Sequence, residues 1–335
     1  MSVILRRVAG VTLLVVIAAG AFVVAARSGW LTPDEATLRA RYALPESRFI
    51  DIDGQSIHYT DEGQGEAVVL VHGSFGSLRM WQDWVQALAP RYRVIRFDRP
   101  PMGLSGSSPV GDYGTDREMQ IIDALTRQLG VERFALVGTS SAGVSTAGYA
   151  AAHPERVSAL VLSNVAVGAF DMHVERLSGW FRMMLRVDGW LGGWHLREFW
   201  RQVMASNFHD PRRLRPELVR EWTDLNNRAQ RMPPGPGSEN PDAAFARTPV
   251  DLPRIVAPTL LLWSANDEEL PVETVGRKGL ALLGSARKSL EIVADCGHMM
   301  PLECGPQSAA RALAFLGSVR ADSAGTQRET TSIGR

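Results

Sequence analysis

The chain has 335 residues, which is enough for one large domain or for a domain with an insertion. It carries 36 basic and 36 acidic side chains, so its formal net charge is zero and no nucleic-acid partner is expected. A hydrophobic fraction of 45% with 21% charged residues is ordinary for a globular protein.

The N-terminal segment is typical of a membrane-spanning helix. Residues Val8–Ala26 carry no charge, and at a rise of about 1.5 Å per residue they span about 28 Å, close to the thickness of a hydrocarbon core. Arg6 and Arg7 before the run predict a cytoplasmic N-terminus and an exported domain. The alternative is a signal peptide processed near Val24–Ala26, which gives a secreted protein. Because the run is longer than a usual signal core, we favour the interpretation that residues 1–30 form an uncleaved membrane anchor.

The following segments alternate between strands and helices. Thr32–Glu35 predicts the start of a short linking helix, and Asp53-Gly54 predicts a two-residue hairpin turn. Continuous apolar strands then alternate with amphipathic helices, which is typical of a mostly parallel sheet covered on both faces. The expected strands are 49–53, 56–60, 67–71, 94–97, 134–137 and 159–162, and the expected helices are 78–88, 119–129 and 141–152.

The alternation breaks between about residues 165 and 251, where the pattern is helical and rich in arginine and tryptophan. Strands resume at 258–263 and 290–293, followed by a helix over 307–316. An insertion between two strands at the carboxyl edge of a sheet is well placed to cap an active site. The predicted parts are an α/β core of residues 31–165 and 252–318, a helical cap of residues 166–251, and a polar, disordered tail of residues 319–335.

Ser140 is the candidate nucleophile. It lies in Leu136–Gly143, directly after an apolar run and before a helix-like segment, with a small residue two places to either side. This pattern is typical of a nucleophile elbow, a tight strand-to-helix turn that exposes a serine hydroxyl. Ser141 competes for the role, but its neighbour Thr139 is β-branched and too bulky for the turn. The non-catalytic alternative is a Gly/Ser-rich helix start that only caps.

A serine nucleophile needs a base, and the base needs an orienting acid. His298 follows the last predicted strand, and Asp267 follows the strand at 258–263, so both are expected at the same sheet edge as Ser140. Asp267 could instead be a surface turn residue. The remaining histidines are less suitable as the base, because they lie in the hairpin, after the first parallel strand, at a helix end or in the cap: His58, His72, His153, His173, His195 and His209.

The motifs resemble, in content and order, those of the α/β-hydrolase superfamily, especially its cap-bearing esterase and meta-cleavage members. Val69–Gly76 is similar to the family's His-Gly oxyanion loop, and Arg96–Ser105 is similar to its Asp-x-x-Gly-x-Gly-x-Ser turn. The resemblance covers roughly residues 49–316. The order Ser-Asp-His along the chain is also the order seen in this superfamily.

The resemblance implies a role for each candidate residue. Ser140 is the expected nucleophile, His298 the base and Asp267 the acid. The expected oxyanion donors are the backbone N–H groups of Ser74 and Ser141, with Phe75 as a substitute for Ser74. No metal and no organic cofactor is implied, and the oligomeric state stays open.

These features together predict a serine hydrolase that cleaves a carboxylic ester or a similar acyl compound through an acyl-enzyme. One alternative is a C–C bond hydrolase of the meta-cleavage type, which shares the same three residues. Another is a non-catalytic scaffold that binds a ligand. The tryptophans of the cap favour a small apolar or aromatic acyl substrate: Trp180, Trp190, Trp194, Trp200 and Trp222.

The two cysteines of the chain, Cys296 and Cys304, lie close together near the end of the predicted core. In an exported protein such a pair can form a disulfide that closes a small loop. Two small buried thiols are the alternative, and it is the one that we favour from the sequence.

Overall fold

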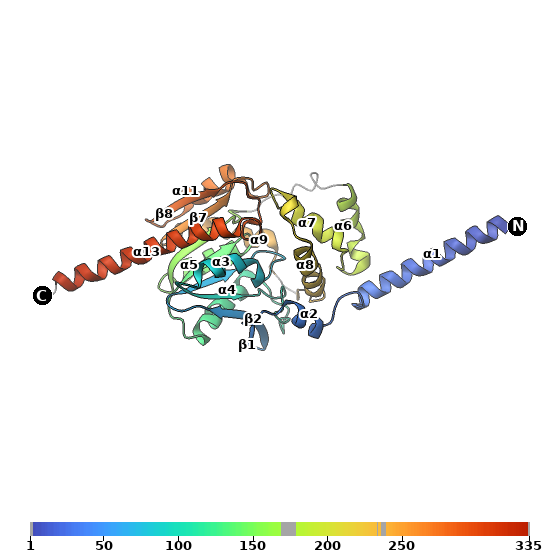
Figure 1. Ribbon diagram of the computed structural model, residues 1–335, viewed down its shortest axis with the longest axis horizontal. Helices are drawn as coiled ribbons and strands as arrows, with labels where there is room; N and C mark the ends of the chain where they lie inside the picture. The colour runs from blue at the N-terminus through green and yellow to red at the C-terminus, as the bar shows by residue number, and fades with distance from the viewer. Residues whose placement is uncertain (1–2, 169–178, 233, 236–238, 334–335) are drawn as a thin grey trace.

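The computed structural model describes residues 3–168, 179–232, 234–235 and 239–333. Within them the chain forms an eight-stranded sheet in the order β1-β2-β4-β3-β5-β6-β7-β8, with helices on both faces (Figure 1). The predicted α/β-hydrolase fold is confirmed. The strands are β1 (Arg48–Ile52), β2 (Gln55–Glu62), β3 (Ala67–Val71), β4 (Arg93–Phe97), β5 (Phe134–Thr139), β6 (Val157–Ser163), β7 (Thr259–Ser264) and β8 (Lys288–Val293).

The sheet begins with the antiparallel hairpin of β1 and β2. Its turn residues Asp53 and Gly54 both have positive φ, 54° and 79°, as a two-residue hairpin turn requires. β2 also pairs antiparallel with β4, and all later neighbours pair parallel. The strands β3, β5 and β7 are buried along their whole length. Burial on both faces explains why their sequences are continuous apolar runs.

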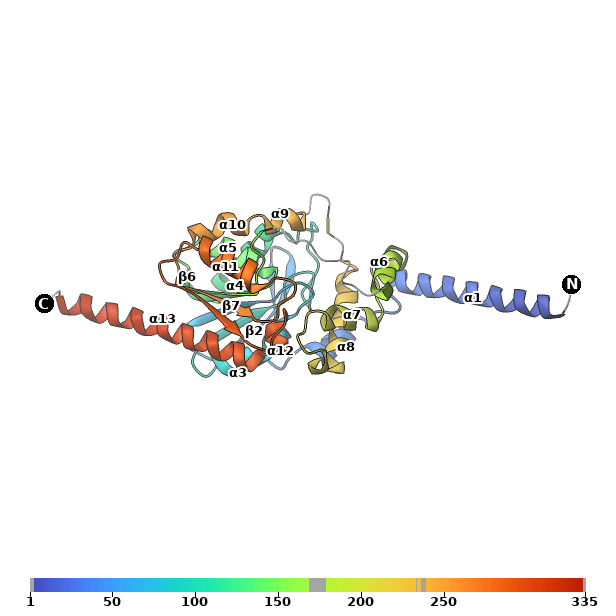
Figure 2. The ribbon, with the colours of Figure 1, turned by 90° about the horizontal axis from the view of Figure 1, so that it is seen from above.

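Helices cover both faces of the sheet (Figures 1 and 2). On one face α3 (Gln82–Leu88) packs against α13 (Gly305–Ile333), above a buried cluster that includes Trp81, Trp84 and Phe315. On the other face α4 (Thr115–Gln128) packs against α5 (Ala142–Ala152) over a second apolar cluster. The shorter helical segments of this core are η1 (Leu78–Trp81), η4 (Leu252–Arg254), the π-helix η5 (Val272–Gly276), α11 (Arg277–Leu282) and α12 (Met300–Glu303).

Between β6 and β7 the described chain is helical. α7 packs against both α6 and α8, and their aromatic and methionine side chains form an apolar cluster distinct from those on the sheet. His173, which the sequence places in the cap, lies outside the described residues. The helices of this region are α6 (Gly179–Leu191), α7 (Arg197–Ala205), η3 (Pro211–Arg213), α8 (Pro216–Ala229), α9 (Pro241–Phe245) and α10 (Thr248–Asp251).

The N-terminal helix α1 (Val3–Ser28) projects from the body of the molecule on the side of the cap helices (Figure 1). Its stretch Arg7–Ser28 is long and apolar enough to cross a membrane, by length and composition. The short helix expected near Pro33 follows as α2 (Glu35–Tyr42), capped by Asp34, whose carboxylate accepts the N–H of Thr37 at 2.7 Å. α2 packs against α8 of the cap.

The prediction for the C-terminal end is wrong. The last helix, expected over 307–316, runs from Gly305 to Ile333, so residues 319–333 are helical rather than disordered. No proline interrupts this stretch. The helix therefore continues past its packed first half without meeting a residue that breaks it. Figure 1 shows α13 leaving the body on the side opposite α1.

Candidate active site

Ser140 lies in a strained turn between β5 and α5. Its φ is 53°, an unusual value for a residue with a side chain, whereas Ser141 has an ordinary helical φ of −59°. A Cβ added to Gly138 would lie 2.3 Å from Thr146 Oγ1, and one added to Gly143 would lie 2.4 Å from the Val165 side chain. Small residues are therefore required around the turn, and the geometry is that of a nucleophile elbow centred on Ser140.

The structure brings the three residues of the predicted triad together. Ser140 Oγ lies 2.9 Å from His298 Nε2, and His298 Nδ1 lies 2.8 Å from Asp267 Oδ2. The other carboxylate oxygen of Asp267 accepts the backbone N–H groups of Glu269 (3.0 Å) and Leu270 (2.8 Å). Because a carboxylate only accepts, His298 donates through Nδ1, and in the neutral ring Nε2 can then accept the serine proton.

The charge around His298 favours its protonated form. Burial opposes protonation, but the carboxylates of Asp267 and Glu269 outweigh it and raise the pKa of His298 to about 9. Glu269 Oε1 lies 3.9 Å from His298 Nε2, on the side of the ring that faces Ser140. His298 is therefore a stronger base than a free imidazole.

A neutral histidine holds the predicted oxyanion loop. Burial and the nearby Arg99 guanidinium lower the pKa of His72 to about 4. Its Nδ1–H donates to the Gly73 carbonyl and its Nε2 accepts the Arg99 N–H, both at 2.8 Å. This arrangement requires an uncharged ring. A Cβ on Gly73 would lie 2.8 Å from Ser140 Cβ, so the loop needs glycine where it passes the candidate nucleophile.

The same loop reaches the residue after Ser140. The Ser74 hydroxyl donates to Ser141 Oγ at 2.9 Å, and Arg99 Nη1 donates to the same oxygen at 3.0 Å. Phe75 has a φ of 60°, and its N–H donates to Met102 Sδ at 3.0 Å. In this structure the Phe75 N–H therefore has an acceptor of its own.

The loop that carries His298 is fixed by residues that the sequence analysis did not identify. Asn164 Nδ2 donates to the carbonyl oxygen of His298 at 2.9 Å, and Glu303 Oε2 accepts the Gly297 N–H at 2.7 Å. Asn164 has a φ of 47° at the end of β6. The sequence signal for Asn164 is its position after a predicted strand, whereas Glu303 is distinguished by no motif.

The cysteines correct the interpretation that we favoured from the sequence. Cys296 and Cys304 are both buried, as expected, but they are bonded to each other as a disulfide. Their Cα atoms lie 6.1 Å apart, and the loop that they close contains His298. Eight residues of separation leave the backbone free to turn back on itself, so spacing alone could not decide between the two states.

A second Ser-His-Asp arrangement lies beside the hairpin. The Asp98 carboxylate lies 2.6 Å from His58 Nδ1, and Ser47 Oγ lies 2.6 Å from His58 Nε2. Asp98 also accepts the N–H groups of Leu78 (2.6 Å) and Leu104 (2.7 Å), so it braces the loops next to the site. The sequence analysis missed this cluster because no elbow motif surrounds Ser47.

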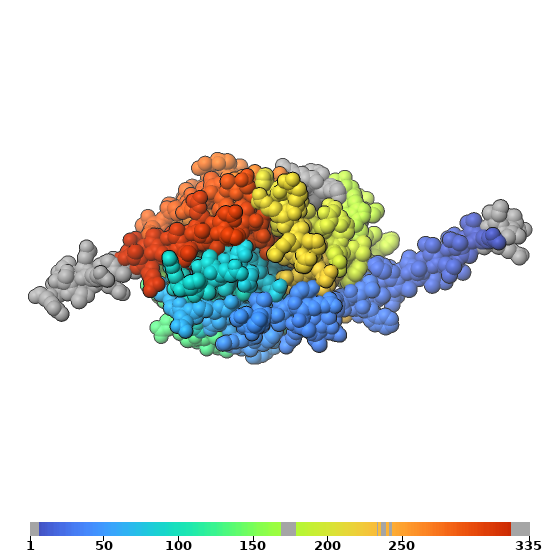
Figure 3. Space-filling model, viewed as in Figure 1, coloured from blue at the N-terminus to red at the C-terminus, as the bar shows by residue number. Residues whose placement is uncertain are grey.

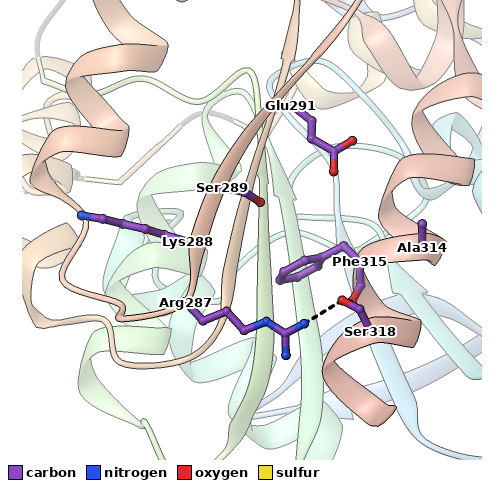
Figure 4. Close-up of a pocket in the computed structure, with 7 residues that line it drawn as sticks. All are labelled: Arg287, Lys288, Ser289, Glu291, Ala314, Phe315 and Ser318. Carbon is purple, nitrogen blue, oxygen red and sulfur yellow. Dashed lines mark hydrogen bonds between the residues drawn. The ribbon is translucent and has the colours of Figure 1, made fainter. Parts of the chain in front are cut away.

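A cavity of about 320 Å³ lies away from these residues, between β8 and the first half of α13. Figure 4 shows its lining, with the Arg287 guanidinium bonded to Ser318 at 2.8 Å. Arg287 and Lys288 stand at the amino end of β8, whereas His298 follows its carboxyl end. The cavity is therefore separate from the Ser140 site.

Residues 66–303 match the family model of the alpha/beta hydrolase fold, and the chain belongs to that family. It is 29% identical over 269 residues to a 2-hydroxy-6-oxononadienedioate/2-hydroxy-6-oxononatrienedioate hydrolase of Klebsiella pneumoniae, a match that covers 75% of this chain and 89% of the relative. The enzyme of the same name from Escherichia coli K12 is also 29% identical, over 275 residues, with the same shares of each chain covered.

Solved structures show the same fold. A meta-cleavage product hydrolase from Pseudomonas fluorescens IP01 superposes with a TM-score of 0.67 at 22% identity, covering 81% of this chain and 97% of that one. A bacterial membrane phospholipase A superposes with a TM-score of 0.64 at 25% identity, covering 94% of this chain and 99% of that one. The chain is therefore a hydrolase of the alpha/beta family.

Proposed function

We propose that this protein is a membrane-anchored serine hydrolase that cleaves carboxylic esters with apolar acyl groups. The observation that carries the proposal is the relay from Ser140 Oγ through His298 to Asp267, with distances of 2.9 and 2.8 Å, beneath an apolar cap. Nucleophile, base and orienting acid are then all within hydrogen-bond reach before a substrate binds.

The reaction follows from these contacts. Ser140 Oγ attacks the ester carbonyl while its proton passes to His298 Nε2, and Asp267 stabilises the resulting imidazolium. His298 then gives this proton to the leaving alcohol. Water attacks the acyl-enzyme in the same way, releases the acid and restores Ser140. The backbone N–H groups of Ser74 and Ser141 are the proposed oxyanion donors; loss of one such donor typically costs about 2.7–4 kcal/mol.

The surroundings of the relay support an apolar acyl group. The apolar cluster of the cap packs against Met299, the residue after His298. Its member Trp200 also packs against Phe75 of the oxyanion loop, with ring centroids 5.4 Å apart. An alkyl or aromatic acyl chain in contact with these side chains loses apolar surface to the cap, which favours its binding.

Three observations support a location outside the cytoplasm with α1 in a membrane. Arg7–Ser28 has the length and composition of a spanning helix. The disulfide Cys296–Cys304 is typical of an oxidising compartment. The likeness to the membrane phospholipase A covers 94% of this chain, more than the 81% matched by the meta-cleavage product hydrolase. We accordingly propose ester groups of membrane lipids as substrates.

A second candidate is C–C bond hydrolysis of a vinylogous diketone. The 29% identity to two hydrolases of oxo-dienedioates favours it, and the same three residues would serve that reaction. Those substrates are dicarboxylates by name, which fits less well with a cap whose described core is built from aromatic and methionine side chains. We therefore rank it below ester hydrolysis.

The test uses the full chain in detergent with three substrates: a short-chain nitrophenyl ester, a phospholipid in mixed micelles, and a vinylogous diketone acid. We expect turnover of both esters and labelling of Ser140 by a fluorophosphonate probe. Turnover of the diketone alone would establish the second candidate instead. Neither labelling nor turnover in folded protein would indicate a non-catalytic ligand-binding scaffold and overturn both.

A further inference from the structure

The end of α1 is joined to the cap helix α6. Phe22 of α1 meets Trp194, which follows α6, edge to face with ring centroids 5.6 Å apart. Arg27 Nη1 donates to the carbonyl oxygens of Gly189 and Trp190 at the end of α6, both at 3.3 Å. These contacts place α6 beside the last turn of α1, as Figures 2 and 3 show. When α1 spans a bilayer, α6 therefore lies at its surface.

The outer side of α6 combines apolar and basic side chains. Five of its large side chains are exposed and form what we call the α6 face: Arg182, Met183, Leu185, Arg186 and Trp190. All of Gly179–Leu191 is described, and its acidic residue, Asp188, lies about 200° around the helix from Arg186 and bonds His195 at 3.0 Å. Arginine together with large apolar side chains on one face is typical of helices that lie in a membrane interface.

The most exposed tryptophans also lie on this side of the molecule. Trp190 on α6 is 71% exposed and Trp30, just after α1, is 87% exposed, while Trp81, Trp84 and Trp263 in the core are fully buried. Tryptophan is enriched at the headgroup level of membranes, where an apolar ring with one polar N–H is well solvated. The two most exposed tryptophans of the described chain thus both lie next to the membrane end of α1.

The inner side of α6 leads toward the catalytic residues. Phe181 and Met184 belong to the same apolar cluster as Trp200, and this cluster packs against Met299 beside His298. One helix therefore presents its outer side to the proposed bilayer surface and its inner side to side chains that continue to the relay. The apolar cluster thus extends from the inner side of α6 to the residue after His298.

We propose that the α6 face and Trp30 form a membrane-docking surface that seats the cap on the headgroup layer of an anionic bilayer. Docking there lets a lipid acyl chain pass from the bilayer along the cap cluster to Ser140. The bilayer is the favoured occupant because the surface continues from the spanning helix and carries arginine at its centre. This inference rests on the proposed function, since it assigns the lipid's route to the same relay.

Docking is tested first by fluorescence of the full chain in vesicles that contain 30% anionic lipid. A polarity-sensitive dye is attached at Trp190→Cys, the native cysteines being bonded and buried. The matched control is Val256→Cys, which is 66% exposed on the loop before β7, at the sheet edge opposite the relay. We expect a blue shift in the emission of the dye at position 190 and none at position 256.

A water-like emission spectrum at position 190 overturns the proposal. Self-quenching between dyes at position 190 also overturns it, because it would make the α6 face an interface between copies of the protein.

Activity gives the second test. Trp190→Asp should reduce hydrolysis of vesicle phospholipid about tenfold and leave a soluble short-chain ester unaffected, because the relay is intact. Val256→Asp should change neither. Arg182→Gln and Arg186→Gln should each lower activity on anionic vesicles about fivefold and change it little on zwitterionic ones. Wild-type rates on vesicles in Trp190→Asp would overturn docking alone, whereas failure of the wild type to cleave any ester would overturn the proposed function.

Discussion

Glu303 accepts the backbone N–H of Gly297 at 2.7 Å, one residue before His298. The same fully buried carboxylate accepts the N–H groups of His209 (2.9 Å) and Asp210 (2.8 Å), which belong to the segment after α7. A Cβ on Gly297 would lie 2.5 Å from the His209 nitrogen, so the two segments touch. One carboxylate therefore fastens the cap to the loop that carries the candidate base.

Glu303→Gln should weaken this junction. Glutamine keeps the shape of the side chain but turns an NH₂ group toward at least one backbone donor. We expect the free energy of unfolding to fall by about 1–3 kcal/mol, the cost of leaving a buried donor unpaired. kcat should also fall, because His298 moves with its loop. Urea unfolding and ester kinetics measure the two effects; the exposed Glu268→Gln is the control. Unchanged kcat in a less stable variant would contradict a positioning role.

The two Ser-His-Asp arrangements should differ completely in reactivity. Ser140→Ala should abolish turnover and fluorophosphonate labelling without unfolding the protein, since the elbow accepts small residues. Ser47→Ala should leave both intact. The Ser47 hydroxyl accepts the Leu44 N–H at 2.8 Å, so its contacts stabilise a turn. Peptide mapping of the labelled protein identifies the site, and a label on Ser47 would overturn our assignment of the nucleophile.

Asp267→Asn tests the acid. Asparagine can keep the two N–H bonds from Glu269 and Leu270 but no longer stabilises the imidazolium or fixes its tautomer. By analogy with the known effect of such a change in a serine-protease triad, kcat should fall by about 10⁴. Circular dichroism checks that the fold is retained. Near-normal kcat in a folded Asp267→Asn protein would move the acid role to another carboxylate, for which Glu269 is the nearest candidate.

The sequence predicted the sheet and the relay because both rest on local patterns. Continuous apolar runs identify β5 and β7 as strands buried on both faces. The relay residues follow β5, β7 and the partly exposed edge strand β8 within five residues. Parallel strands end at a common edge, so Ser140, Asp267 and His298 had to lie near one another. The elbow motif further distinguished Ser140 from Ser141, because only a small neighbour tolerates the strained turn.

These local patterns could not predict contacts between residues that are far apart in the sequence. Glu303 and Asn164 act on His298 through bonds to backbone atoms, which require no particular motif at either partner. The same holds for the contact of α1 with α6, since Phe22 and Trp194 are 172 positions apart. The C-terminal tail was misjudged for a different reason: its polar composition indicates poor burial, but the backbone hydrogen bonds of a helix are local and do not require burial.

Removing the disulfide should loosen the loop of His298. In the Cys296→Ala/Cys304→Ala double variant we expect a loss of about 2.5 kcal/mol in unfolding free energy, the chain-entropy effect of a closed loop of this length. The fold-decrease in kcat should be larger than the fold-change in KM, because the substrate contacts of the cap are unaltered. Unfolding with and without reductant gives the comparison, and the reductant should have no effect on the double variant. Two free thiols in the native protein, detected by alkylation, would contradict the pairing.

The pH dependence of kcat/KM should report the charge around His298. The base must be neutral to take the serine proton, and its pKa is raised to about 9, so activity rises with pH along an acid limb centred above 6.5, the usual histidine value. Glu269 contributes to this increase from 3.9 Å by stabilising the imidazolium. Glu269→Gln removes that charge, lowers the pKa and should move the acid limb down by roughly one pH unit. Glu268→Gln is again the control. A limb that stays in place, or that moves upward, in Glu269→Gln would show that Glu269 does not act on His298 through its charge.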